Sequence, residues 1–262
     1  MIDLFRRDGR PLVVGHRGAP ALAPENTLDA FRAAVELGVD LVELDVLALR
    51  NGPLVVAHSD RLDELSHGSI SGRVGDRTLA ELREVAPALP TFDEALEWFA
   101  GEAPSVGIHV DLKLRDRIDE VVSLLEAHRL TDRAVVTSVH ADVLRTAARA
   151  SSRIRLGLTY PEDRLGVSRR AAFRPAVRAC LVALRASVPR RLPGMLGRSG
   201  AGAAMLQHLL ITPGAVARAH DVGVPLLAWT VDEPADMARV IAAGVDGVIT
   251  NDPKTLLATL AA

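Results

Sequence analysis

The sequence lacks the residues and runs that would tie the chain together covalently or anchor it in a membrane. Cys180 is the single cysteine in 262 residues, which excludes an internal disulfide framework and suits a reducing compartment. No window approaches the roughly 18 uninterrupted apolar residues of a membrane span. Residues 1–7 also lack the apolar stretch of a signal peptide. We therefore expect a soluble, cytoplasmic protein.

A strong charge imbalance is also missing. The formal net charge is −2, which gives no general reason to expect nucleic acid as a partner. Apolar residues make up 48 % of the chain, enough for a sizeable core, so disorder is not expected. A chain of this length forms one large α/β domain or two small ones.

Two carboxylates stand inside an apolar run that is typical of a buried strand. Residues 41–46 read Leu-Val-Glu-Leu-Asp-Val. Because side chains alternate along a strand, Glu43 and Asp45 leave the same face. Two like charges side by side in a core are very costly unless a cation lies between them. The pattern therefore indicates a functional site rather than ordinary core packing.

A second apolar run follows this strand closely. Asn-Gly at 51–52 signals a tight turn, and the next run begins at Leu54. The gap is too short for a parallel crossover, which needs about a dozen residues. We therefore predict an antiparallel β-hairpin over 41–58, with Asp45 opposite or nearly opposite His58.

Strand and helix patterns alternate along the whole chain. Strands are expected at 12–15, 41–46, 54–58, 106–113, 134–137, 154–158, 203–210, 225–231 and 247–250. Helices are expected at 27–37, 78–85, 91–99, 117–128, 141–150, 213–222, 234–243 and 253–262. Asn26 is the expected cap of the first helix, and Thr91 with Glu94 forms a capping box for the third.

This alternation favours a parallel sheet with helices outside it. If one arm of the hairpin is extra, eight strands remain, which is the number in a TIM-type (β/α)8 barrel. We therefore predict one α/β barrel domain over residues 1–262. A doubly wound open sheet is the alternative, but the sequence has no Gly-rich phosphate loop to support it.

The segment 160–202 is too long for an ordinary connection and is rich in arginine. Eleven arginines lie between Arg153 and Arg198, against two acids, Glu162 and Asp163. Its apolar residues recur at helical spacing, at positions 173, 177, 180, 184 and 188, with Pro175 in the first turn. The favoured interpretation is a helical insert packed on the barrel with solvated arginines. The alternative is peripheral contact of residues 165–200 with an anionic membrane.

Acidic and basic side chains gather at the expected ends of the strands. Glu43, Asp45 and Asp111 offer only oxygen ligands, which suit one hard divalent cation, Mg²⁺ or Ca²⁺. Two histidines, His16 and His58, can act as general acid and base, since imidazole titrates near neutral pH. Two cations, Arg17 and Lys113, suit phosphate oxygens. This combination describes hydrolysis of a phosphodiester.

At these residues the chain resembles the glycerophosphodiester phosphodiesterase family. The matching motifs occur in the family's order: His16-Arg17-Gly18, Pro24-Glu25-Asn26-Thr27, Glu43-Leu44-Asp45, the run from Gly52 to His58, Asp111-Leu112-Lys113, Trp229-Thr230-Val231-Asp232 and the run from Ile249 to Pro253. Each tripeptide alone is weak evidence, but the ordered set covers nearly the whole chain.

The resemblance implies a barrel and metal-dependent cleavage of glycerophosphodiesters to an alcohol and glycerol 3-phosphate, in lipid and glycerol metabolism. It assigns Glu43, Asp45 and Asp111 to the metal, and His16 and His58 to acid–base catalysis. It places Arg17 and Lys113 on the phosphate and Trp229 against the glycerol or alcohol moiety. Plain core packing is the alternative for Trp229.

The chain departs from the family pattern at several positions. Asp111 stands where the family usually has Glu, Ser59 separates His58 from Asp60, and Asn251 replaces the usual Asp. Together with the basic insert, these departures leave other functions open. One alternative is a phospholipase D-like enzyme acting on lysophospholipid or sphingolipid at a membrane. Another is a non-catalytic metal- or phosphate-binding barrel. The sequence does not predict an oligomeric state.

Overall fold

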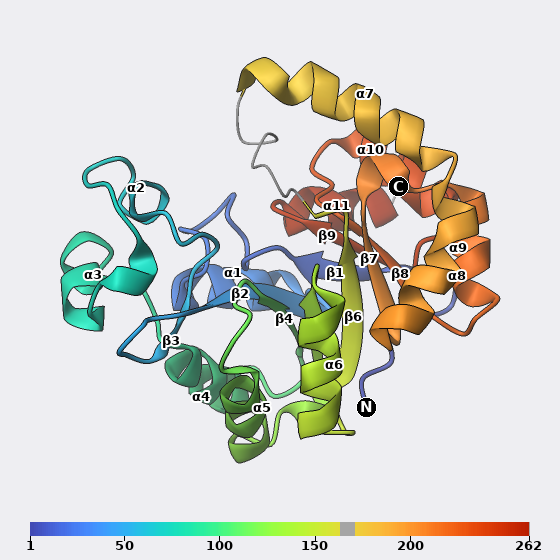
Figure 1. Cartoon of the computed structure of the whole chain (residues 1–262). Coiled ribbons are helices and arrows are strands. Elements are labelled where there is room, and N and C mark those ends of the chain that lie inside the picture. Colours follow the sequence, from blue (N-terminus) through green and yellow to red (C-terminus); the bar gives the residue numbers. More distant parts are fainter. Residues whose placement is uncertain (163–170, 262) are drawn as a thin grey trace.

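The computed structural model describes residues 1–162 and 171–261, and its centre is a closed β-barrel (Figure 1). Its strands are β1 (Leu12–Gly15), β2 (Leu41–Ala48), β4 (Gly107–Leu112), β5 (Ala134–Ser138), β6 (Arg155–Tyr160), β7 (Ala203–Gln207), β8 (Leu226–Trp229) and β9 (Gly247–Thr250). Neighbouring strands pair in parallel, and β1 pairs with both β2 and β9, which closes the ring. The predicted TIM-type barrel is confirmed.

The predicted hairpin is confirmed as well. The extra strand β3 (Leu54–Val56) pairs antiparallel with β2, with Val46 opposite Val56. One residue further along, the amide of Ala57 donates to the carbonyl of Asp45 at 3.0 Å. His58 therefore leaves the hairpin next to the residue that faces Asp45, one position away from the strictly opposite register.

Helices surround the barrel in the predicted alternation. They are α1 (Leu28–Leu37), α2 (Leu62–Leu65), α3 (Leu79–Val85), α4 (Phe92–Glu102), α5 (Ile118–Ala127), α6 (Ala141–Ala150), α7 (Arg174–Arg185), α8 (Val188–Ser199), α9 (Pro213–His220), α10 (Pro234–Ala242) and α11 (Pro253–Ala261). Short 3₁₀ turns occur at η1 (Val74–Asp76), η2 (Thr131–Arg133), η4 (Ala171–Phe173) and η5 (His208–Leu210). The strand predicted at 203–210 therefore ends early, at Gln207.

The first helix begins one residue later than predicted. Its N-cap is Thr27, whose hydroxyl accepts from the amide of Ala30, and not Asn26. Asn26 lies outside the helix with φ +58°, and its side chain turns toward the barrel. The predicted capping box of Thr91 with Glu94 at the start of α4 is confirmed.

The core has two layers because side chains alternate along each strand. Inward-facing residues such as Leu12, Val14 and Met205 fill the barrel with a small aliphatic cluster. The intervening residues, such as Val13, pack outward against the helices in a much larger cluster. The inward face of β2 carries Leu41 in this inner cluster, and Glu43 and Asp45 follow it toward the carboxyl end of the strand.

The basic insert folds into two helices at the carboxyl side of β6. Helix α8 packs on the barrel domain through Val188, Leu192 and Leu196, which are buried. Pro175 lies in the first turn of α7 as predicted. The predicted apolar stripe is wrong at Phe173 and Cys180, which are exposed. Three of the counted arginines, at positions 164, 169 and 170, lie outside the described residues.

Across the part of the chain that the structure describes, every helix is too short or too polar to span a bilayer.

Substitution by alanine should change the stability in opposite directions at two glycines, because Gly157 lies in the packed barrel and Gly101 lies on an exposed helix surface. A Cβ on Gly157 in β6 would lie 2.8 Å from Cγ2 of Thr137 and 2.9 Å from Sδ of Met205. We expect Gly157→Ala to lower the free energy of unfolding by about 1–3 kcal/mol through overpacking. A Cβ on Gly101 in α4 would meet no atom within 4 Å, so Gly101→Ala should raise the free energy of unfolding by about 0.5–1 kcal/mol.

Urea unfolding of both variants measures the two effects. Equal effects of the two substitutions would show that the barrel interior relaxes around an added methyl group.

Candidate active site

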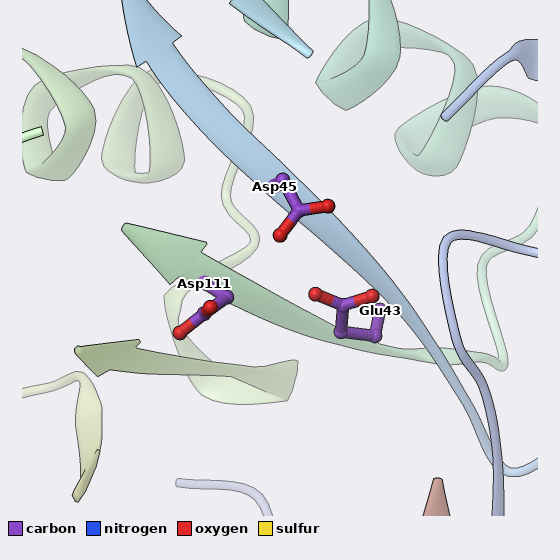
Figure 2. A group of neighbouring side chains, drawn as sticks. All are labelled: Glu43, Asp45 and Asp111. Carbon is purple, nitrogen blue, oxygen red and sulfur yellow. The ribbon is translucent and has the colours of Figure 1, made fainter. Parts of the chain in front are cut away.

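Three carboxylates meet at the carboxyl end of the barrel interior. Glu43 and Asp45 come from β2 and Asp111 from β4, and the parallel register sets Asp45 beside Asp111 (Figure 2). One oxygen from each of the three lies within 4.8 Å of the others, and all three residues are buried. This is the group that the sequence pattern predicted as metal ligands.

The electrostatics of this group fit a cation. Burial raises the pKa of Glu43 well above its ordinary value, and the neighbouring Asp45 and Asp111 raise it further. Oδ1 of Asp45 is buried and, apart from its ion pair with Lys113, has no hydrogen-bond partner among the described residues. Three oxygen ligands at this spacing match the preference of Mg²⁺ or Ca²⁺ for carboxylates. The residues present therefore fit a divalent metal ion.

Two side-chain cations flank the carboxylates. Nε of Arg17 lies 3.0 Å from Oδ2 of Asp45, and Nζ of Lys113 lies 3.0 Å from Oδ1 of the same residue. Lys113 also forms an ion pair with Asp111. Burial favours the protonated Asp45, but Lys113 and Arg17 outweigh burial and hold its pKa below the ordinary value. Asp45 is therefore ionised, as a metal ligand must be.

The loop that follows β1 holds the carboxylates from one side. The amide of Arg17 donates to Oε2 of Glu43 at 2.8 Å, and the guanidinium of Arg17 binds both oxygens of Glu25 at 2.9 Å. Nδ2 of Asn26 donates to Oδ2 of Asp45 at 2.9 Å, and Oδ1 of Asn26 accepts from the Asp45 amide at 3.2 Å. Asn26, predicted as a helix cap, is thus a residue that fixes the orientation of Asp45.

His16 is oriented by a chain of two further residues. Its Nδ1 lies 2.7 Å from Oδ1 of Asn251, whose Nδ2 donates to Asp232 at 2.8 Å. Because Oδ1 of Asn251 can only accept, Nδ1 of His16 carries the proton. Nε2 of His16 therefore has a free lone pair, and it lies 3.9 Å from Oε2 of Glu43. Burial and then Arg17 lower the pKa of His16 to about 4. The imidazole is therefore neutral at pH 7 in the metal-free protein.

His58 approaches from the hairpin on the other side. Burial is the main reason that its pKa falls to about 3, with Arg17 and Lys113 adding to the effect. The ring lines a cavity of about 620 Å³ between the loop of residues 20–27 and the segment of residues 59–90 that follows β3, called the excursion below. No arginine or lysine of the described residues lines this cavity.

Asp111 is supported by hydroxyls from the next two strands. Oγ1 of Thr137 in β5 donates to Oδ1 of Asp111 at 2.6 Å, and Oγ1 of Thr159 in β6 lies 3.4 Å from the same oxygen. Nε2 of His109 lies 2.8 Å from Oγ1 of Thr137. Since the Thr137 hydroxyl donates to Asp111, it accepts from His109, and the buried Nδ1 of His109 has no partner in the described part of the chain.

Two residues whose roles the sequence left open are placed clearly. Asp60 accepts from Nε of Arg73 at 2.6 Å and from the amide of Gly75 at 2.8 Å, so it holds the excursion after β3 together. Trp229 lies half-buried at the end of β8, and its Nε1 donates to the carbonyl of Met205 at 3.0 Å. In the ring of strands β8 lies across from β4. Trp229 is therefore on the far side from Asp111 across the mouth of the barrel, which is its open end at the carboxyl ends of the strands.

The structure thus brings together the predicted set around the carboxylates: His16, Arg17, Glu43, Asp45, His58, Asp111 and Lys113. Sequence reasoning missed Asn26, Thr137 and the pair of Asn251 and Asp232 as supporting residues. The sequence motifs contain Asn26, Asn251 and Asp232, but they do not show which residues these three contact.

Comparison with known proteins points to one family. The model of the glycerophosphoryl diester phosphodiesterase family matches residues 16–255. A protein named glycerophosphodiester phosphodiesterase from Caldanaerobacter subterraneus subsp. tengcongensis is 30 % identical over 262 aligned positions, which cover 95 % of this chain and 97 % of the relative.

Solved structures show the same fold. A candidate glycerophosphoryl diester phosphodiesterase from Silicibacter pomeroyi superimposes with a TM-score of 0.81 at 24 % identity, covering 98 % of this chain and 95 % of that one. A phosphodiesterase from Oleispira antarctica, in complex with the product sn-glycerol-3-phosphate, superimposes with a TM-score of 0.73 at 20 % identity, covering 96 % of this chain and 97 % of that one.

The support of Asp111 yields a prediction on metal binding. Thr137→Val keeps the shape of a fully buried side chain but removes the hydroxyl that orients Asp111. We expect the affinity for Mg²⁺ or Ca²⁺ to fall about 10- to 100-fold, as is typical when a partner of a metal ligand is lost. Titration calorimetry on the folded variants measures this change.

Thr159→Val is the matched control, because its hydroxyl lies 3.4 Å from the same oxygen and contributes less. Equal metal affinity of Thr137→Val and the unmodified protein would show that Asp111 does not depend on this hydroxyl.

The histidines predict a particular response to pH in the chelated protein. Their pKa values, about 4 for His16 and about 3 for His58, lie below the value of 6.5 for an ordinary imidazole. The unfolded chain therefore binds more protons between pH 6.5 and about 3, so this contribution to stability is present above pH 6.5 and is lost as the pH falls.

Imidazole ¹⁵N chemical shifts at pH 5.5 measure the protonation directly. Both rings should be neutral there. A charged ring at either position would contradict the burial argument.

Proposed function

Because the chain belongs to the glycerophosphoryl diester phosphodiesterase family, we propose that it hydrolyses glycerophosphodiesters to an alcohol and glycerol 3-phosphate with the help of one divalent cation. One observation carries the proposal: three buried carboxylates, two neutral histidines and two cations converge at the mouth of the barrel. A site of this composition can hold a metal, bind a phosphate and move protons at neutral pH.

Glu43, Asp45 and Asp111 would hold the ion, either Mg²⁺ or Ca²⁺. When bound, such an ion acts as a Lewis acid that offsets the negative charge developing on the phosphate oxygens. Arg17 and Lys113 add fixed positive charge at the same place. In the metal-free protein both pair with Asp45, so both already lie within reach of a group bound to the carboxylates.

The two histidines supply the proton transfers. Hydrolysis requires one group to accept a proton from the attacking oxygen and another to donate a proton to the departing alcohol oxygen. His16 presents an unprotonated Nε2 next to Glu43, which suits the accepting role. His58 borders the cavity beside the excursion, where a departing alcohol has room. The negative charge of a bound phosphate diester would raise the pKa of His58, so that the ring can carry the proton that it donates. The reverse assignment uses the same two residues.

The glycerol phosphate would extend toward Trp229 on the opposite side of the mouth. The indole is fixed by its bond to Met205, so its face is held rigidly at the barrel opening. The related phosphodiesterase from Oleispira antarctica was solved with sn-glycerol-3-phosphate as product. This supports glycerol 3-phosphate as the product here. A non-catalytic barrel is disfavoured, because such a protein would have no need of two half-buried, neutral histidines beside the carboxylates.

Removal of either histidine tests the proposal. We expect His16→Ala and His58→Ala each to lower kcat for glycerophosphocholine by about 100-fold or more, since each removes one proton transfer. His128→Ala is the matched control, because His128 binds Asp93 on the outside of the barrel. Release of glycerol 3-phosphate is measured with Mg²⁺, with Ca²⁺ and with a chelator.

Chelation should abolish release, and added metal should restore it. A folded protein that binds metal but releases no glycerol 3-phosphate would overturn the proposed reaction. Near-normal turnover in one histidine variant would remove that histidine from the mechanism.

A further inference from the structure

The exposed large apolar side chains are distributed unevenly over the molecule. Among the described residues they are Met1, Leu22, Ile70, Phe173, Val182 and Val222. Ile70 lies in the excursion after the antiparallel strand β3, which borders the cavity beside His58. Three of the six follow the carboxyl ends of parallel barrel strands: Leu22 after β1, and Phe173 and Val182 after β6. Connections of this kind lie at the end of a barrel where the site is built. Met1 and Val222 belong to the opposite end, before β1 and β8.

Helix α7 lies on the mouth side of the barrel. It packs against η5, which follows the carboxyl end of β7, and Figure 1 shows it above the end of β6. Val177, Leu181 and Leu184 form its half-buried inner face. The residues of the outer face are Pro175, Ala176, Ala179, Cys180, Val182 and Ala183, and all are exposed. An ordinary surface helix carries charged or polar residues on this face.

The charge of the same segment is of one sign. From Ala171 to Gly202 it contains six arginines and no acidic residue. Three of them, at positions 185, 190 and 191, form no ion pair with a carboxylate of the described residues, whereas Arg178 interacts electrostatically with Asp236. An apolar face flanked by unpaired arginines is complementary to an anionic lipid surface, where each cation contributes about tenfold or less to binding.

The acidic residues of the excursion after β3 do not oppose this contact. In the excursion after β3, Asp60, Asp63 and Asp76 pair with arginines. The tip of the excursion, residues 66–72, holds Ile70 and no Asp or Glu. The apolar rim defined by Leu22, Ile70, Phe173 and Val182 can therefore approach a negatively charged surface without a repelling carboxylate at its tip.

We infer that this apolar rim and the arginines of α7 dock the protein on an anionic membrane, with the barrel mouth toward the lipid. Docking in this orientation presents the site with diesters that are anchored in the membrane by an acyl chain, such as lysophospholipids. The assignment of a membrane-anchored substrate rests on the proposed function, whereas membrane binding does not. The 620 Å³ cavity beside His58 is lined by Pro20 and Leu65, which stand close in the sequence to Leu22 and Ile70 of the rim, and it would receive the alcohol side of such a substrate.

Vesicle binding of the full chain tests the docking surface. We expect cosedimentation with vesicles of phosphatidylglycerol and phosphatidylcholine, and little with phosphatidylcholine alone. Val182→Ser should weaken binding about tenfold by removing an apolar contact. Val222→Ser is the matched control, because Val182 is 50 % exposed and Val222 is 49 % exposed at the opposite end.

The arginines are tested in the same assay. Arg185→Gln should weaken binding about fivefold, and a salt concentration of about 0.5 M should weaken binding of the unmodified protein further. Arg149→Gln, on the exposed side of α6, should have no effect. Equal binding to both kinds of vesicle, or equal loss with Val182→Ser and Val222→Ser, would overturn the proposal.

Hydrolysis rates on a soluble and on a membrane-bound diester distinguish a defect in docking from a defect in catalysis. Val182→Ser should release glycerol 3-phosphate from soluble glycerophosphocholine at the normal rate, but should be about tenfold slower on a lysophospholipid in anionic vesicles. Failure on the soluble diester with intact vesicle binding would overturn the proposed reaction alone. A concentration-dependent dimer that Val182→Ser dissociates would overturn the lipid surface and assign the rim to a second copy of the chain.

Discussion

Mutual repulsion among three buried carboxylates is the constraint on which the rest of the site depends. Glu43, Asp45 and Asp111 lie close enough to share one ion, and their burial removes the water that would otherwise screen them. Arg17 and Lys113 offset part of this charge by pairing with Asp45. Burial is the main reason that the pKa of Glu43 is raised, and Asp45 and Asp111 raise it further, so the two cations do not offset the combined cost of burial and repulsion. The protein therefore keeps a place for a further positive charge, which a metal ion can supply.

The barrel provides this place by the same alternation that builds its core. Along the inward face of β2, Leu41 belongs to the aliphatic filling, and Glu43 and Asp45 stand above it at the open end. The filling prevents water from entering from below, so the carboxylates are solvated only through the mouth. The hairpin strand β3 then returns His58 to this opening without a crossover. The inward-facing side chains of the strands therefore form the core inside the barrel and the site at its open end.

The sequence predicted the features that are local, and missed those that depend on distant partners. Alternation, turn residues and helix caps lie within a few positions of one another, so the barrel, the hairpin and most helices could be predicted. Asn26 and Thr27 are equally good caps by composition, and only the turn of the chain at Asn26 decides between them. The partner of Asn26 is 19 positions away and that of Asp111 is 26 positions away, beyond the reach of a local pattern.

Asp111 shows how the fold accommodates a shorter side chain at a position where the related family usually has Glu. A carboxylate with one methylene fewer has less reach, so its direction must be fixed more firmly to remain near Glu43 and Asp45. The fixing atoms come from neighbouring strands: the hydroxyl of Thr137 binds Asp111, and His109 in turn donates to Thr137. Hydroxyls on parallel strands in register reach the same level of the barrel, because strand pairing sets Asp111 beside Thr137. A short carboxylate on one strand is thus oriented by the residue next to it on the adjacent strand.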